Sequence, residues 1–290
     1  MSGNANIEIK HIIVPFDFSN SAKNALQHAI SIAKKFRADL TLLSVMDSYS
    51  SQFLQYKGNK FTEFKPLAQE KLNEQVKQLF TFNKIECIVS ETKWSRAVVE
   101  LSDKNAGSII VLGAGGAKGR DGYFDGSHAY RIVDSMNIPL MVVKEHHQVK
   151  DYKVITTPLD ETFHTREKLP FVTLMAHAFD AKVSVVGLQT HTDKESSSHM
   201  QAIMRQASQY VQLKVKEYQD KLVASKNEVT DLVKQADDDK ADLVVIMSSH
   251  EKSLSNLFSG SYAQQVTDKS NSPILICPIR VSLVMGAVSI

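Results

Sequence analysis

The chain has 290 residues, of which 43% are hydrophobic and 23% charged, the balance of a folded globular protein and the opposite of a disordered one. Its 34 basic and 32 acidic side chains leave a net charge of +2, too even to indicate nucleic acid or an anionic membrane surface as a partner. This length fits two domains of ordinary size.

Neither end of the chain indicates export or membrane insertion. Residues 1–6 lack the apolar core of a signal peptide, and the apolar stretch 281–290 is shorter than the roughly 20 residues that a spanning helix needs. Cys87 and Cys277 each lie in an apolar, strand-like run, so we expect both to be buried thiols in a reducing compartment. A soluble cytoplasmic protein is the expectation.

In the first half, apolar runs typical of buried strands alternate with amphipathic segments typical of helices. The expected strands are 11–16, 39–46, 85–90, 108–113 and 139–144, and the expected helices are 19–36, 64–81, 93–105 and 126–136. Strands separated by helices of this length predict βαβ units, with a parallel sheet covered on both faces. On the third helix we expect Trp94 to pack into the core.

The second half repeats the first in the same order. Segment 11–17 matches 153–160, 38–45 matches 181–188, and 137–143 matches 272–276. The repeat predicts strands at 153–157, 181–188, 221–225, 242–247 and 273–277, and one amphipathic helix over 196–222. We therefore expect tandem domains, 1–148 and 149–290, joined by a short polar linker in which His146 and His147 are exposed.

A glycine pattern follows the fourth expected strand of the first half, and it reads Gly113-x2-Gly116-x9-Gly126-Ser127. Gly113 and Gly116 allow positive φ and close backbone approach, and Gly126–Ser127 would open a helix whose amides converge on a phosphate. Asp17 ends the first expected strand. Because ligands of an open parallel sheet bind beyond the carboxyl ends of its strands, Asp17 would face this loop and accept a ribose hydroxyl. Alternatively, Asp17 only caps the helix that follows it.

The segment Pro15–Ser19, the glycine spacing and the segment 137–143 resemble the universal stress protein family, strongly over 7–145 and more loosely over 152–280. The resemblance implies an α/β protein with two tandem Rossmann-like (adenine nucleotide alpha hydrolase-like) domains, each a five-stranded parallel sheet with helices on both faces. It also implies an adenine nucleotide, ATP or AMP/ADP with or without Mg²⁺, as ligand. The family pairs domains through their last strands; here the two halves would supply that pairing internally, and a homodimer of the whole chain stays open.

By the same resemblance, Asp17 and Val45 would lie around ribose and adenine, Leu112 and Gly113 would line base and sugar, and the remaining glycines with Ser127 and His128 would hold the phosphates. The candidate nucleotide-binding residues are Pro15, Asp17, Val45, Leu112, Gly113, Gly116, Gly126, Ser127 and His128.

The second half carries an altered version of this site. Ser248 and Glu251 stand where the first half has Gly113 and Gly116, while Asp160 and Gly260–Ser261 remain. A Cβ at position 248 obstructs backbone approach, and Glu251 places negative charge where phosphates would lie. We predict that the second domain does not bind ATP.

Three functions remain open at this point. The leading hypothesis is a nucleotide-dependent regulator of the stress response. Slow ATP hydrolysis or adenylyl transfer is the enzymatic alternative, although the histidines and cysteines show no metal-ligand spacing and no catalytic constellation. A ligand-free dimerisation or interaction scaffold is the third, and co-purified nucleotide would tell it from the first.

Overall fold

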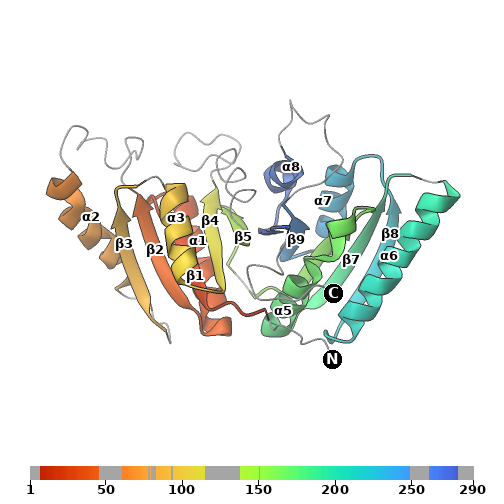
Figure 1. Cartoon of the computed structure of the whole chain (residues 1–290), viewed down its shortest axis with the longest axis horizontal. Coiled ribbons are helices and arrows are strands. Elements are labelled where there is room, and N and C mark those ends of the chain that lie inside the picture. Colours follow the sequence, from red (N-terminus) through yellow and green to blue (C-terminus); the bar gives the residue numbers. More distant parts are fainter. Residues whose placement is uncertain are drawn as a thin grey trace. The chain divides into compact units, whose positions relative to one another are not determined.

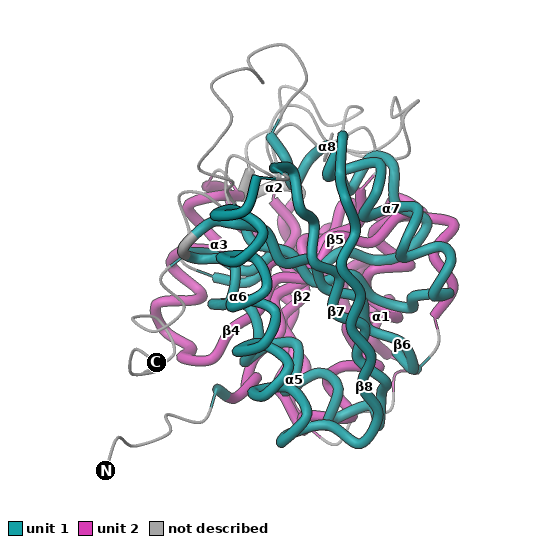
Figure 2. Tube along the Cα trace, turned by 90° about the vertical axis from the view of Figure 1, so that its right-hand side faces the viewer, with its two compact units in different colours: residues 1–7, 133–139, 150–290 teal, residues 8–132, 140–149 magenta. Residues whose placement is uncertain are grey.

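The computed structural model of the chain describes residues 7–45, 61–77, 79, 83–92, 94–114, 138–149, 151–191, 193–248 and 261–279. The chain divides into two compact units (Figure 2). The N-terminal unit, magenta in Figure 2, comprises residues 8–132 and 140–149. The C-terminal unit, teal in the same figure, comprises residues 150–290 with 1–7 and 133–139.

The N-terminal unit is an open parallel sheet with helices on both faces (Figure 1). Its elements are β1 (His11–Pro15), α1 (Asn20–Phe36), β2 (Asp39–Val45), α2 (Phe61–Val76), β3 (Ile85–Ser90), α3 (Trp94–Lys104), β4 (Ser108–Ala114) and β5 (Leu140–Lys144). The strand order is β3-β2-β1-β4-β5, and each neighbouring pair is parallel. Every residue of β1, β4 and β5 is buried, as expected for strands covered on both faces.

The C-terminal unit repeats this topology. Its elements are β6 (Val154–Leu159), η2 (Phe163–Arg166), α5 (Leu169–Phe179), β7 (Lys182–Gln189), α6 (Lys194–Gln212), β8 (Tyr218–Ala224), α7 (Glu228–Asp238), β9 (Leu243–Met247), α8 (Tyr262–Lys269) and β10 (Ile274–Cys277). The order β8-β7-β6-β9-β10 is again parallel throughout. The predicted fold class is confirmed in both units. Across the described ranges, no helix combines the length and apolarity that crossing a membrane requires.

A serine caps one helix in each unit. Ser19 Oγ accepts a hydrogen bond from the N–H of Ala22 at 3.1 Å and starts α1. Ser261 Oγ accepts one from the N–H of Gln264 at 3.3 Å and starts α8. On α3, Trp94 is buried, which confirms that it packs into the core.

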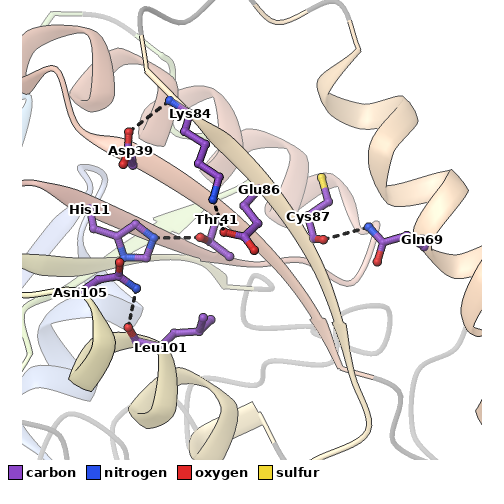
Figure 3. Close-up of polar contacts among 9 residues, drawn as sticks. All are labelled: His11, Asp39, Thr41, Gln69, Lys84, Glu86, Cys87, Leu101 and Asn105. Atoms are coloured by element: carbon purple, nitrogen blue, oxygen red, sulfur yellow. Dashed lines mark hydrogen bonds and ion pairs between the residues drawn. The ribbon is translucent and has the colours of Figure 1, made fainter.

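A buried histidine joins three strands of the N-terminal unit at their amino ends. Figure 3 shows its contact with Thr41. His11 Nε2 lies 2.8 Å from Thr41 Oγ1 on β2, and its Nδ1 lies 3.0 Å from Ser108 Oγ on β4. Burial lowers the pKa of His11, while the carboxylates of Asp39 and Glu86 act in the opposite direction. The ring is therefore a neutral hydrogen-bonding bridge inside the sheet at neutral pH.

The helix predicted over 196–222 is wrong in its second part. Helix α6 ends at Gln212, and residues 218–224 form β8, which pairs with β7 from Val183 opposite Tyr218 to Gln189 opposite Ala224. The apolar stripe of α6 ends at Val211, and Leu213 beyond it is 87% exposed. Val215, Tyr218 and Leu222 continue the helical spacing of that stripe, so the sequence favours a longer helix. In the structure, residues 218–224 pair with β7 as a strand instead.

Two exposure predictions are also wrong. Cys277 is fully buried as expected, but Cys87 is only half-buried because β3 is an edge strand of its sheet. His146 is exposed as expected, but His147 is buried. The His147 ring turns back onto its own segment, where Nδ1 accepts the N–H of Lys144 at 3.1 Å, and its carbonyl accepts the Asn24 side chain of α1 at 2.8 Å.

Candidate functional site

The candidate site lies at the carboxyl ends of β1, β2 and β4 in the N-terminal unit. From β1 the chain goes to β2 on one side, while β4 lies against the other side of β1, so strand order reverses between β1 and β4. Open α/β sheets bind ligands at such a switch point. Five candidates thus lie at or near the carboxyl ends of these strands: Pro15, Asp17, Val45, Leu112 and Gly113. The other candidates, Gly116, Gly126, Ser127 and His128, lie outside the described residues.

Exposure separates the described candidates into two groups. Pro15, Leu112 and Gly113 are buried, and Leu112 packs inside the sheet in register with Val142 of β5. Asp17 and Val45 are partly exposed. A ligand at these strand ends would therefore meet the carboxylate of Asp17 and the end of β2 first.

Asp17 is held in a defined turn. Its Oδ1 accepts the backbone N–H of Ser19 at 3.0 Å, which is an Asx turn directly ahead of α1. Phe18, inside the turn, has φ 66°, a left-handed conformation that is rare for a bulky residue. Its buried ring meets the buried Phe16 ring edge-on with centroids 5.2 Å apart, and this packing holds the unusual turn in place.

The alternative interpretation, that Asp17 is the cap of α1, is wrong. Ser19, and not Asp17, is the residue that caps α1. Asp17 supports the same turn through one carboxylate oxygen and presents a partly exposed negative charge at the switch point. Nearby, the hydroxyls of Ser19 and Ser21 lie 3.0 Å apart in the first turn of α1. A carboxylate and hydroxyls in this position can recognise a polyol such as ribose.

Gly113 is required for a reason that the sequence did not indicate. Among the described glycines, positive φ occurs at Gly107 and not at Gly113. A Cβ on Gly113 would lie 2.3 Å from the carbonyl carbon of Ser21, 2.4 Å from its oxygen and 2.5 Å from the nitrogen of Ala22. The close backbone approach at this glycine is therefore that of the first turn of α1 over β4, and it fixes the helix that follows Asp17.

The corresponding strand end of the C-terminal unit is built differently. Asp160 follows β6 and forms the same Asx turn, in which Oδ1 accepts the N–H of Thr162 at 2.7 Å and also the Thr162 hydroxyl. The helix does not start there, however; the short η2 comes first and α5 begins only at Leu169. Ser248 replaces Gly113 in this setting, where it is buried and its N–H donates to the carbonyl of Cys277 at 2.8 Å.

A lysine that the sequence analysis missed is connected to Asp160 through Thr165. Lys168 is 1% exposed, and its Nζ donates to the carbonyl oxygen of Thr165 and lies 3.4 Å from Thr165 Oγ1. Thr165 Oγ1 in turn accepts the N–H of Asp160 at 2.9 Å. Burial lowers the pKa of Lys168 to about 8, against the opposing effect of the Asp160 carboxylate. In the sequence, Lys168 is a charged residue after the first predicted strand of the second half, and the pattern assigned it no role.

The described residues at the two strand ends do not form a metal site. Within the ranges that the structure covers, no three His, Cys, Asp or Glu side chains gather in a geometry that could hold a metal ion.

Comparison with known proteins agrees with this architecture. The sequence model of the universal stress protein family matches residues 8–144 and 151–278. A universal stress protein of Methanocaldococcus jannaschii is 29% identical over 141 residues, which are 47% of this chain and 82% of that protein.

Solved structures show the same fold. A universal stress protein from Archaeoglobus fulgidus superposes with a TM-score of 0.68 at 14% identity, covering 95% of this chain and 98% of that one. A universal stress protein in complex with cAMP covers 44% of this chain and 98% of its own at 21% identity and a TM-score of 0.38, and it says nothing of the ligand of this chain. The repeated topology, the two matched segments and the superposition over nearly the whole length agree: the chain belongs to the universal stress protein family, with two family domains in tandem.

Proposed function

We propose that this universal stress protein binds an adenine nucleotide, ATP or its AMP/ADP remnant, in its N-terminal domain and acts in the cytoplasm as a nucleotide-dependent regulator of the stress response. The observation that carries the proposal is the partly exposed carboxylate of Asp17, held in an Asx turn at the point where strand order reverses. Nucleotide binding acts as the signal, and no chemical step is required of the protein.

Each described candidate has a physical role in this proposal. Asp17 accepts a ribose hydroxyl, and Val45 at the end of β2 supplies apolar contact to the base. Gly113 allows α1 to lie close over β4, which places Asp17. The segment from Gly116 to His128 holds the phosphates according to the family resemblance, and Mg²⁺ enters only as a counter-ion of those phosphates. The boundary between residues 148 and 149, the internal pairing of the domains and a homodimer remain predictions.

The test is a thermal shift with ATP and AMP on the wild type and on Asp17→Asn. Asparagine keeps the Oδ1 acceptor for the N–H of Ser19, so the turn persists. It replaces the other carboxylate oxygen by an amide donor and removes the charge. At 100 times its dissociation constant, a nucleotide stabilises the wild type by about 2.7 kcal/mol, and we expect Asp17→Asn to lose most of this gain.

The matched control is Asp160→Asn, the same substitution in the same type of turn of the C-terminal unit. We expect it to leave the nucleotide-dependent shift unchanged. The proposal fails if the wild type shows no shift up to millimolar ATP with Mg²⁺, or if Asp17→Asn and Asp160→Asn have the same effect on the shift. Hydrolysis is scored in the same samples against Gly126→Val, because products above that control would favour the enzymatic alternative.

A further inference from the structure

The two aspartates at corresponding strand ends have different electrostatic surroundings. Asp17 is partly exposed, whereas Asp160 is 7% exposed and its Oδ1 accepts two hydrogen bonds from Thr162. A carboxylate this deeply buried needs a compensating positive charge or a full set of donors to remain ionised. The question for the C-terminal unit is which group supplies that compensation.

Lys168 has the opposite requirement. Its ammonium group is buried in the same region, and Thr165 connects the two residues: Lys168 Nζ donates to the Thr165 carbonyl, and Thr165 Oγ1 accepts the N–H of Asp160. Hydrogen bonds to a neutral carbonyl and hydroxyl do not cancel a buried charge, so the ammonium needs an anion nearby.

Asp160 is the group that meets this need. Among the described residues, the titratable groups that act on Lys168 are Asp160 and Cys277. Burial raises the pKa of the Cys277 thiol to about 12, so the thiol is neutral at physiological pH. Tyr262, which also lies in the field of Asp160, has its pKa raised by burial and is neutral as well. Within the described part of the chain, the Asp160 carboxylate is therefore the negative charge that acts on the Lys168 ammonium.

We propose that Lys168 is the internal counter-ion of Asp160, which makes this aspartate a structural residue of the C-terminal unit and withdraws it from ligand recognition. The first long helix starts three residues after Asp17 in the N-terminal unit but nine residues after Asp160 in the C-terminal unit, and Lys168 directly precedes this later start. The two family domains thus give corresponding aspartates different roles. The proposal for Lys168 does not depend on nucleotide binding by the N-terminal unit.

A double-mutant cycle on the full chain tests this, with Lys168→Met, Asp160→Asn and the double variant. Hydrogen exchange followed by mass spectrometry reports peptides from β6 and α5, and peptides from β1 and α1 are the internal reference. Removing one of two buried opposite charges that compensate each other is expected to lower protection of β6 and α5 about 100-fold or more. The double variant is expected to recover most of it, because no unpaired charge remains and methionine fills the space of the lysine stem.

The matched control is a surface pair of the same unit, Lys234 and Asp238 of α7, whose charged atoms are 2.7 Å apart and whose side chains are 72% and 51% exposed. The corresponding cycle, Lys234→Met with Asp238→Asn, is expected to change protection only a few-fold. The proposal is overturned if the losses of Lys168→Met and Asp160→Asn add in the double variant, or if the double variant is no better folded than the single ones. The peptides that decide the outcome belong to the C-terminal unit, and those of the N-terminal unit serve only as a reference, so failure of nucleotide binding there would leave the result unchanged.

Discussion

Replacing Gly113 by alanine tests how the N-terminal site is built. The added Cβ would lie 2.3 Å from the carbonyl carbon of Ser21. Ordinary contact begins at 3.4 Å, so the first turn of α1 has to move away by about 1 Å. This turn is fixed by the Ser19 cap, and further along α1 the Asn24 side chain donates to the carbonyls of Lys144 and His147, at 2.8 Å each. Because all the clashing atoms are backbone, we expect a loss near the upper end of overpacking costs, about 3 kcal/mol.

The assay is urea unfolding followed by fluorescence of Trp94, the single tryptophan of the chain, which is buried in the N-terminal unit. A loss of about 3 kcal/mol raises the unfolding equilibrium constant more than 100-fold, without nucleotide present. Gly187→Ala on β7 is the matched control, followed by circular dichroism. There the new Cβ would meet Met204 Sδ at 2.8 Å and the ends of Leu222 and Met200 at 2.9 Å. These flexible ends can turn aside, so the expected loss is about 1 kcal/mol.

A loss below about 1 kcal/mol in Gly113→Ala, equal to that of Gly187→Ala, would refute the reasoning. If Gly113→Ala costs about 3 kcal/mol, loss of the proposed nucleotide binding in a Gly113 variant would reflect damage to the fold, and Asp17→Asn is the informative probe of the ligand.

Three further predictions concern single groups. The pKa of lysine is 10.5 in the unfolded chain, and burial lowers the pKa of Lys168 to about 8 in the native state. Between pH 8 and 10.5 the unfolded state therefore binds more protons, so the unfolding free energy rises with pH. We expect this rise to exceed that of Lys168→Met by about 3 kcal/mol. Equal pH profiles for wild type and Lys168→Met in urea unfolding would contradict this; the comparison is needed because buried tyrosines and thiols act in the opposite direction. Burial lowers the pKa of His11 and His28, so the N-terminal unit loses stability as pH falls below about 6.5, and His11→Gln reduces that slope without abolishing it; an unchanged Trp94 transition profile would contradict the assignment. Ser19→Ala removes the cap of α1 and is expected to cost about 1 kcal/mol, whereas Ser19→Asp retains it; equal stability of the two variants would show that the cap contributes nothing.

The parallel order of both sheets could be predicted because central strands are buried on both faces. Runs such as 11–16 and 108–113 are therefore continuously apolar, and the alternation with helices leaves few topologies. Edge strands carry a weaker signal. In β8, Asp220, Lys221 and Leu222 are all exposed, so its composition could not be told from the end of an amphipathic helix. The half-exposure of Cys87 on edge strand β3 has the same cause.

The position of the site could be predicted from the sequence, but the contacts that hold its residues in place could not. Asp17 could be placed at the switch point because a strand end and a helix start are local features. The contact of Gly113 with the backbone of Ser21 depends on segments far apart in the sequence, and so does the burial of His147 against Asn24 of α1. Lys168 is close to Asp160 in the sequence, but the burial of Lys168 follows from the short helix η2 ahead of α5, which the hydrophobic periodicity did not predict.

We propose an asymmetry between the two domains, in which the N-terminal domain binds an adenine nucleotide and the C-terminal domain does not. Isothermal titration of the nucleotide-stripped full chain with ATP, checked by native mass spectrometry, counts bound nucleotides directly. The account predicts one nucleotide per chain in the wild type, one in Asp160→Asn and a large loss of affinity in Asp17→Asn. Two nucleotides per wild-type chain, or none, would contradict it.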